Sequence, residues 1–212
     1  NGITFHTYGL TECIKKGREY IHWDEKREAY KNQNGPVRRG VGMAMFIYKT
    51  GVYPISLETA SARITLNQDG SIQLSMGATE IGQGADTVFT QMAAETTGIS
   101  VDRVYINSTQ DTDVTPFDTG AYASRQTYVS GMACKKCALE FRQKVLEYAA
   151  YMLNHDVTDL SKTVYADLVK EAAGKVRQVL GLHAEEEITW EMLDIADSQV
   201  VVNGGDPVLF DV

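Results

Sequence analysis

The sequence of 212 residues lacks several features, and each absence argues against a class of protein or a kind of site. It has no apolar run near 18 residues and no signal peptide, so we expect no membrane span and no secretion signal. Lys and Arg number 20 against 28 Asp and Glu, and the net charge of −8 argues against non-specific nucleic-acid binding, which needs clustered positive charge. Three cysteines cannot form a paired disulfide framework, and reduced thiols are typical of the cytoplasm, where we expect this protein.

A zinc or iron–sulfur site is not indicated either. Cys134 and Cys137 form a lone C-x-x-C pair inside a strongly helical stretch. A zinc site needs one or two further ligands nearby, and none of the histidines shows ligand spacing to this pair. No cysteine pattern for an iron–sulfur cluster is present. We therefore interpret both cysteines as ordinary helix residues and predict no metal ligand in the chain.

Hydrophobic periodicity predicts an α+β (mixed α/β) fold, with hairpin strands and crossover helices. A rough 3.6-residue period over 8–33 predicts a first helix, which ends at Asn34-Gly35-Pro36. Further helices are predicted at 87–97, 126–153 and 158–174. Strands are predicted at 40–47, 61–66, 71–76, 101–106, 198–202 and 208–212. The turn from Asn67 to Gly70 makes a hairpin of the second and third of these strands.

The two ends of the sequence also shape the expected domain organisation. The chain begins at Asn1 rather than at methionine, and its last residues, 209–212, have the pattern of a strand in progress. No internal repeat or low-complexity segment divides it. We expect 1–212 to be one domain or fragment, taken from inside a longer polypeptide.

A glycine-rich turn joins the strand predicted at 71–76 to the helix predicted at 87–97. It reads Gly77-Ala-Thr-Glu-Ile-Gly-Gln-Gly-Ala-Asp86. Glycine serves where φ must be positive or where a ligand comes close to the backbone, and the free N–H groups of a helix's first turn attract anions. The stretch predicts a backbone cradle for an anionic ligand, with a ligand-free glycine turn as the alternative. It is neither a P-loop nor a dinucleotide fingerprint, because Gln83-Gly84 replaces Lys-Ser/Thr and the third glycine of the fingerprint is missing.

A second group of small residues precedes the helix predicted at 126–153. The segment Gly120-Ala-Tyr-Ala-Ser-Arg125 leaves N–H groups available to a ligand in the same way. Ser124 could cap the helix or bond a ligand, and capping is the default. Arg125 could pair with phosphate, although a solvated arginine is commoner. Because the EF-hand spacing is absent, we interpret the nearby acidic residues as turn residues rather than as a divalent-ion site: Asp111, Asp113 and Asp118.

Taken together, these motifs resemble the molybdenum-binding subunit of the xanthine dehydrogenase / aldehyde oxidoreductase family, and bacterial xanthine dehydrogenases most of all. Two long motifs match in the family's order and at its separation, Gly77–Thr87 with Gln91–Glu95 and then Asp111–Thr127. Arg39–Gly42 also fits. The resemblance is best over 38–155 and thinner on both flanks.

This resemblance implies a molybdenum hydroxylase, which adds water-derived oxygen to a substrate carbon. A molybdopterin, in bacteria usually the cytosine dinucleotide, holds the molybdenum. Gly82, Gln83 and Gly84 resemble the family's turn that contacts the pterin and phosphate part of this cofactor. A second contact segment, acting largely through backbone N–H groups, is implied for Ala121, Tyr122, Ala123, Ser124 and Arg125. Implied partners are the rest of the molybdenum subunit, subunits or domains with iron–sulfur clusters and FAD, and a small-molecule substrate.

Two segments of the family pattern are missing. We find no Phe-Gly-Gly type contact and no Gly-x-Gly-Glu with the family's catalytic glutamate, and Glu80 lies inside the cofactor turn, where we do not expect the base. No catalytic residue is predicted, and the fragment alone is expected to be inactive. Xanthine or hypoxanthine is the preferred substrate of the parent protein, since Gly120–Arg125 resembles bacterial xanthine dehydrogenase. The alternatives are aldehydes, nicotinate or other N-heterocycles, aromatic CoA thioesters, and a non-catalytic homologue that serves assembly or cofactor binding.

Overall fold

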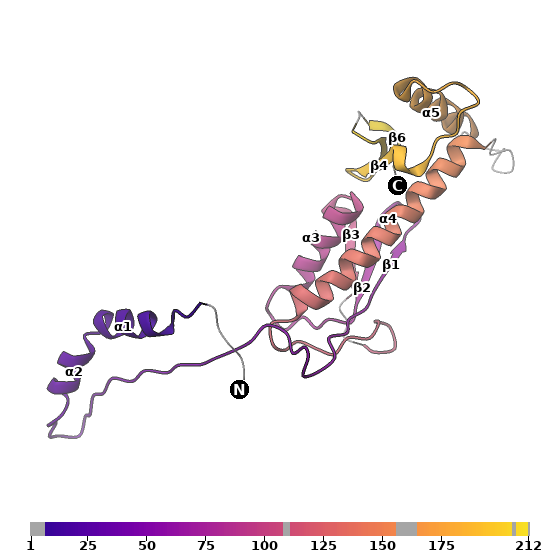
Figure 1. The fold of residues 1–212 in the computed structure, drawn as a ribbon. Coiled ribbons are helices and arrows are strands. Elements are labelled where there is room, and N and C mark those ends of the chain that lie inside the picture. The colour runs from indigo at the N-terminus through magenta and orange to yellow at the C-terminus, as the bar shows by residue number, and fades with distance from the viewer. Residues whose placement is uncertain (1–6, 108–110, 156–164, 205–206, 212) are drawn as a thin grey trace. The chain divides into compact units, whose positions relative to one another are not determined.

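The structure, a computed structural model, describes residues 7–107, 111–155, 165–204 and 207–211 (Figure 1). Helices and two small sheets make up this described part, so the predicted α+β class is confirmed. The chain divides into two compact units, Asn1–Ile47 and Tyr48–Val212. Among the described residues, no helix combines the length and the apolar character that crossing a bilayer requires.

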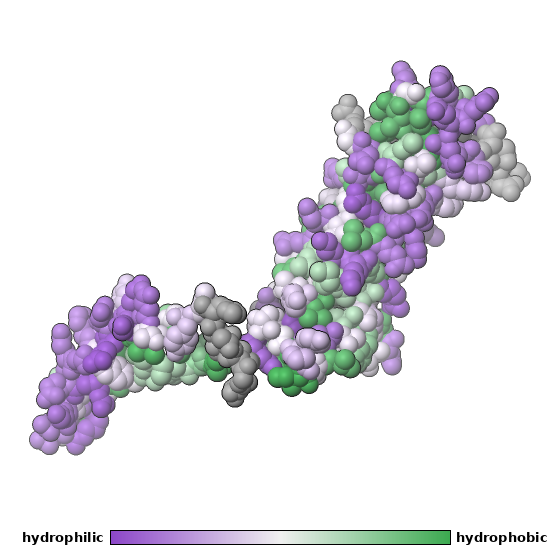
Figure 2. Space-filling model, viewed as in Figure 1, coloured by the Kyte–Doolittle hydropathy of each residue, from purple (hydrophilic) through white to green (hydrophobic). Residues whose placement is uncertain are grey.

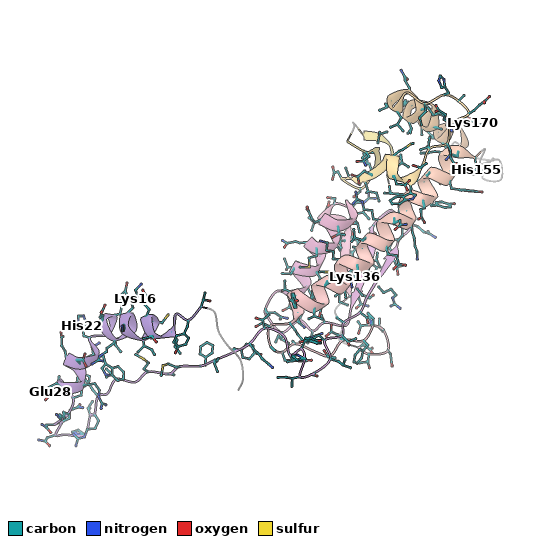
Figure 3. All side chains as sticks on the ribbon, in the orientation of Figure 1. Lys16, His22, Glu28, Lys136, His155 and Lys170 are labelled. Carbon is teal, nitrogen blue, oxygen red and sulfur yellow. The ribbon has the colours of Figure 1, made fainter. Side chains whose placement is uncertain are left out.

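The first unit begins with two helices, so the single helix predicted over 8–33 is wrong. They are α1 (Leu10–Tyr20) and α2 (Trp23–Ala29). His22 separates them in the left-handed conformation, with φ 52° and ψ 52°. In one continuous helix, Ile21 and Trp23 would be related by a rotation of about 200° around the axis and would lie on nearly opposite faces. With the break at His22, both side chains are half-buried. Figure 3 labels one side chain on each helix and one at the break: Lys16, Glu28 and His22.

The segment that follows α2 forms no strand, so the strand predicted at 40–47 is wrong. A strand needs a neighbour to take up its backbone N–H and C=O groups. Within the described part of the chain, this segment has no ladder partner. Hydrophobic colour therefore lies on the surface of this stretch (Figure 2), where large apolar side chains are exposed: Met45, Phe46 and Ile47 among them.

The second unit contains a three-stranded sheet in the order β1–β2–β3, with strands Ala62–Leu66, Ile72–Met76 and Val104–Asn107. β1 and β2 pair antiparallel across a tight turn, which confirms the predicted hairpin. β3 pairs parallel with β2, so the helix between them, α3 (Ala85–Thr97), is a crossover connection as predicted. A short 3-10 turn, Val101–Arg103, replaces the first half of the strand predicted at 101–106.

The long helix α4 (Gly131–Asn154) packs beside α3 and over β1 (Figure 1). A π-helical turn, η2 (Gln126–Ser130), precedes it, so the helix predicted at 126–153 is confirmed with a wider first turn. Part of the hydrophobic core lies between the sheet and these two helices. Its fully buried residues in this part include Ile72, Leu74, Met76, Phe89, Ala93 and Cys134.

Cys134 and Cys137 are ordinary residues of α4, as predicted. Cys134 is fully buried, with its Sγ 3.7 Å from the Phe89 carbonyl oxygen. Burial raises the pKa of this thiol to about 12. A thiol that stays protonated is a poor nucleophile and a poor metal ligand. Across residues 7–107, 111–155, 165–204 and 207–211, no group of three or more His, Cys, Asp or Glu is placed to hold a metal ion.

A helix and a second small sheet complete the second unit. α5 (Tyr165–Leu180) covers part of the helix predicted at 158–174 and extends past it, and the first residues of that prediction lie outside the described chain. The sheet has the order β4–β5–β6, with antiparallel strands Leu193–Ala196, Gln199–Val202 and Pro207–Asp211. β5 and β6 confirm the last two predicted strands, apart from Val212, which is outside the described chain. β4 was not predicted from the sequence, although its burial alternates as in a half-buried strand.

Candidate functional site

The glycine turn lies between the end of β2 and the start of α3, where the sequence predicts it. Gly82 and Gly84 have positive φ angles of 96° and 84°, a region that residues with a side chain rarely adopt. Gly84 is also the N-cap residue of α3. A Cβ atom added at either glycine would meet no heavy atom within 4 Å. The backbone conformation therefore requires glycine, and the space beside both residues is open.

The N–H groups of this turn are occupied by the Glu80 carboxylate. Its Oε1 accepts hydrogen bonds from the N–H of Gly82 at 2.6 Å and of Gly84 at 3.2 Å, and its Oε2 accepts one from Asp86 at 3.1 Å. These bonds, led by the one from Asp86, lower the pKa of Glu80. The expectation of free N–H groups at the start of α3 is therefore wrong, because the chain supplies its own anion there.

A Glu80→Gln variant is expected to unfold at a lower temperature than the wild type at pH 7. The folded pKa of Glu80 lies below its unfolded value, so the ionised carboxylate stabilises the fold above the ordinary glutamate pKa of about 4.3. That stabilisation is lost as the pH falls through the lower, folded pKa. Circular dichroism melts at pH 7 and pH 3 should show a difference that shrinks in acid. Glu95→Gln, at an exposed glutamate of α3, the helix that follows the turn, is the control. A drop in the melting temperature of Glu80→Gln that is equal at both pH values would contradict a role for the charge.

The second predicted segment turns sharply just before η2. Ala123 and Ser124 have left-handed φ angles of 48° and 49°. Such residues cost on the order of 1–3 kcal/mol each and persist only where their surroundings hold them. The Ala123 N–H donates to the Tyr48 hydroxyl at 2.7 Å, and the Ala123 carbonyl accepts the Gly51 N–H at 2.6 Å. Residues far away in the sequence therefore hold this turn.

Arg125 is fully buried behind the turn, so the expectation of a solvated arginine is wrong. Its Nε donates to Glu58 Oε2 at 2.7 Å, and its Nη1 donates to Asp118 Oδ1 at 2.5 Å. Further bonds run from Nη1 to the Gly120 carbonyl at 2.9 Å and from Nη2 to the Thr59 carbonyl at 2.7 Å. The Arg125 hydrogen bond lowers the pKa of Glu58, against the opposing effect of burial. These partners occupy guanidinium donors that a phosphate group would need.

The acidic residues before this segment make turn contacts, as the sequence suggests. Asp111 Oδ1 accepts the Asp113 N–H at 2.9 Å, and Asp118 Oδ1 accepts the Gly120 N–H at 2.9 Å. Asp118 does more than this, because its other oxygen, Oδ2, accepts the Ser130 hydroxyl at 2.7 Å. Asp118 therefore links the segment to η2 as well as to the guanidinium of Arg125.

Two glutamines join the glycine turn to the second segment. Gln83 Nε2 donates to the side-chain oxygen of Gln126 and, at 2.9 Å, to the Thr79 carbonyl. Gln126 Nε2 donates to the same carbonyl at 2.9 Å. The two glutamines are 43 residues apart in the sequence. The structure thus brings together the two segments that the sequence singles out.

A pocket of about 330 Å³ opens where the two segments meet. Most of the predicted site residues line it: Gln83, Ala121, Tyr122, Ser124 and Arg125. The other three do not line the pocket, but their positive φ angles turn the backbone next to it: Gly82, Gly84 and Ala123. Lining residues that the sequence did not predict are Tyr48, Ile81, Gln126 and Thr127. The last three lie within the predicted motifs, although they were not predicted as site residues, whereas nothing in the sequence near Tyr48 indicates that it lies here.

The pocket wall offers backbone N–H donors. Within the described part of the chain, no acceptor is found for the N–H groups of Ala121, Tyr122 and Ser124. Such groups need a partner from water or from a ligand. Ser124 is exposed, and the N-cap residue of η2 is Arg125 with no side-chain cap, so the capping interpretation is wrong. The arrangement can hold a ligand with several acceptor oxygens through the main chain.

The chain is similar to proteins of known family over most of its length. Residues 16–194 match the family described as molybdopterin cofactor-binding domain. The chain is 50% identical over 160 residues to the putative xanthine dehydrogenase molybdenum-binding subunit XdhA of Escherichia coli K12, covering 76% of this chain and 21% of that protein. It is 38% identical over 151 residues to the probable hypoxanthine oxidase XdhD of the same strain, covering 71% of this chain and 15% of that protein. Quinoline 2-oxidoreductase from Pseudomonas putida 86 aligns with a TM-score of 0.47 and 22% identity, over 72% of this chain and 16% of that one.

Proposed function

This chain belongs to the molybdopterin cofactor-binding domain family, and on that premise we propose that its pocket binds part of a molybdopterin cofactor. The whole protein is then a molybdenum hydroxylase of the xanthine dehydrogenase type. On this proposal 1–212 is a central part of its molybdenum subunit, best supported over 38–155. When bound, the cofactor supplies the molybdenum that transfers water-derived oxygen to a substrate carbon and takes up two electrons.

The meeting of two distant segments in one pocket is the observation that carries this proposal. The pocket fits a pterin and phosphate ligand in two respects: residues that line it have main-chain N–H groups without internal acceptors, and the space beside the glycines of the adjoining turn is open. Gln83 adds a side-chain oxygen with one acceptor position left, since its amide N–H groups bond Thr79 and Gln126 and its oxygen accepts the Ile81 N–H. We assign Gly82, Gln83 and Gly84 to one contact with the cofactor, and to the other Ala121, Tyr122, Ala123, Ser124 and Arg125. No residue of this chain is assigned a catalytic or metal-ligating role.

The relatives suggest a purine as the substrate of the whole protein. One is named a putative xanthine dehydrogenase subunit and the other a probable hypoxanthine oxidase. We therefore propose xanthine or hypoxanthine as the substrate and the cytosine dinucleotide as the form of the cofactor. The proposed partners are subunits or domains that carry iron–sulfur clusters and FAD, in the cytoplasm. Aldehydes and other N-heterocycles are the alternative substrate classes.

Metal and pterin analysis of the full-length protein, purified from its own host with its partners, tests this proposal. We expect molybdenum and a cytosine-dinucleotide pterin in amounts stoichiometric with the protein, and turnover of xanthine or hypoxanthine. A folded complex that contains neither molybdenum nor pterin would contradict the proposal. That outcome would favour a non-catalytic homologue that serves assembly.

Gly84→Val is expected to abolish cofactor loading of the full-length protein while leaving its expression possible. A φ of 84° disfavours a β-branched residue, and the isopropyl group would fill the open space beside the turn. Molybdenum content, measured by mass spectrometry, reports the loss. Gly181→Val is the matched control, because Gly181 also has a positive φ, 67°, and open space, but follows α5 and belongs to neither proposed contact segment. Full molybdenum content in Gly84→Val would contradict the assignment.

A further inference from the structure

The guanidinium of Arg125 donates hydrogen bonds along its edges and contacts an aromatic ring with one face. Its hydrogen bonds go to Glu58, Asp118 and the carbonyls of Thr59 and Gly120. The Tyr122 ring lies over it, with the Arg125 Cζ 5.5 Å from the ring centroid. Arg125 is among the residues around the pocket, yet it is fully buried. A ligand in the pocket therefore meets the Tyr122 ring and the main chain rather than the guanidinium.

The charge of this network does not favour an anion. Arg125 contributes one positive charge and Glu58 and Asp118 contribute two negative charges, so the three groups sum to −1. The attraction of the guanidinium for a nearby phosphate is thus more than cancelled by its own partners. Retention of an anionic ligand has to come from the main-chain N–H donors of the pocket wall.

The same network fixes the shape of the turn at 120–125. Glu58 accepts hydrogen bonds from both Arg125 and the Val52 N–H. Asp118 accepts hydrogen bonds from Arg125 and the Ser130 hydroxyl. The loop that contains Glu58 and the segment that contains Asp118 are therefore tied to each other through one side chain. The left-handed residues Ala123 and Ser124 lie between these anchors.

We propose that Arg125 is a positioning residue, which together with Glu58 and Asp118 holds the 120–125 turn so that its main-chain N–H groups meet the ligand. The Arg125 side chain does not itself pair with phosphate. This inference rests on the proposed function and assigns the side chain a role other than phosphate pairing. The two roles predict opposite results for Glu58. If the guanidinium paired with phosphate, removing the Glu58 charge would strengthen binding, whereas for a positioning residue the loss of the Glu58 hydrogen-bond acceptor weakens binding.

Glu58→Ala and Glu58→Gln in the full-length protein separate these roles. Both variants remove the same charge, but only glutamine keeps an oxygen that can accept from Arg125. Its amide nitrogen then faces the Val52 N–H, which bonds the other carboxylate oxygen of Glu58. We expect Glu58→Ala to reduce molybdopterin content per chain on the order of tenfold, as for the loss of one charge-assisted hydrogen bond. Glu58→Gln should retain most of the wild-type content. Glu140→Gln is the control, since Glu140 is 70% exposed and pairs with Lys144 on the surface of α4.

Two outcomes of the cofactor measurement overturn the inference: a content that rises in the variants, or a content that both variants change equally. Amide hydrogen exchange gives a readout that does not need the cofactor. Exchange at Ala123, whose N–H is bonded to Tyr48, should speed up in Glu58→Ala and stay near the wild-type rate in Glu58→Gln. Unchanged exchange in both variants also overturns it. A wild type without molybdopterin would instead overturn the proposed function, and the exchange rates then decide the positioning role by themselves.

Discussion

Arg125→Met is expected to lower the free energy of unfolding of this chain by about 3–5 kcal/mol, a large part of the 5–15 kcal/mol typical of a folded domain. Methionine fills much of the arginine's volume but has no donor. Asp118, whose side chain is fully buried, is then left without its cation. The Gly120 carbonyl also loses its donor, and the Thr59 carbonyl keeps only the 3.4 Å bond from the Thr119 hydroxyl. Removing one partner of a buried pair leaves the desolvation penalty of the other uncompensated.

Arg142→Met is the matched control for this substitution. Arg142 pairs with Asp194, but the two side chains are 32% and 31% exposed. Because water screens such a pair, its loss should lower the free energy of unfolding by no more than about 1 kcal/mol. Urea titrations at pH 7, followed by circular dichroism, measure both values. Equal losses would mean that burial does not set the contribution of the Arg125 network.

The parts of the fold that depend on sequence neighbours could be predicted. The strands of the β1–β2 hairpin and the turn between them are contiguous, so alternation and turn residues suffice to define it. The glycine turn is equally local, because a strand, a run of glycines and a helix follow one another. Two motifs of this kind also contain most of the residues that line the pocket.

Pairing with a distant partner could not be predicted in the same way. The segment at 40–47 has the composition of a strand, but composition does not reveal whether a neighbouring strand is present. In the part of the chain that the structure describes, none is paired with it, and Phe46 and Ile47 are 89% and 75% exposed. The helix break at His22 was missed for a related reason. A rough 3.6-residue hydrophobic period over 8–33 fits one long helix as well as two short ones, so it does not reveal the break between them.

The contacts behind the pocket lie beyond sequence reasoning for a different reason. Glu58 and Arg125 are 67 residues apart, and no local pattern connects them. At the glycine turn the sequence displays both a cradle of N–H groups and the nearby Glu80 carboxylate. Only the geometry shows that the carboxylate fills the cradle. A motif therefore indicates where N–H donors gather, but not which of these donors are already used.

Gly77→Ala is expected to lower the free energy of unfolding by about 2–3 kcal/mol, as overpacking in a close-packed region does. Gly77 follows β2 directly, and its φ is not positive, so its conformation alone admits alanine. The space does not: an added Cβ would overlap the Pro116 carbonyl oxygen and lie 2.8 Å from the backbone N of Asp118. Backbone atoms cannot swing aside as a flexible side chain can. The loop would have to move, although Asp118 is bonded to Arg125 and Ser130.

Gly174→Ala provides the control for this prediction. Gly174 is an exposed glycine within α5, and a Cβ there would meet no atom within 4 Å. In a helix interior this change should stabilise the chain by about 0.5–1 kcal/mol. Both variants add one methyl group at an ordinary φ. If the free energy of unfolding falls in Gly77→Ala and rises in Gly174→Ala, the difference is due to the contact of the added Cβ with the 116–118 backbone. A Gly77→Ala variant as stable as the wild type would show that the 116–118 loop moves freely, and Asp118 could then no longer be regarded as a fixed anchor of the pocket.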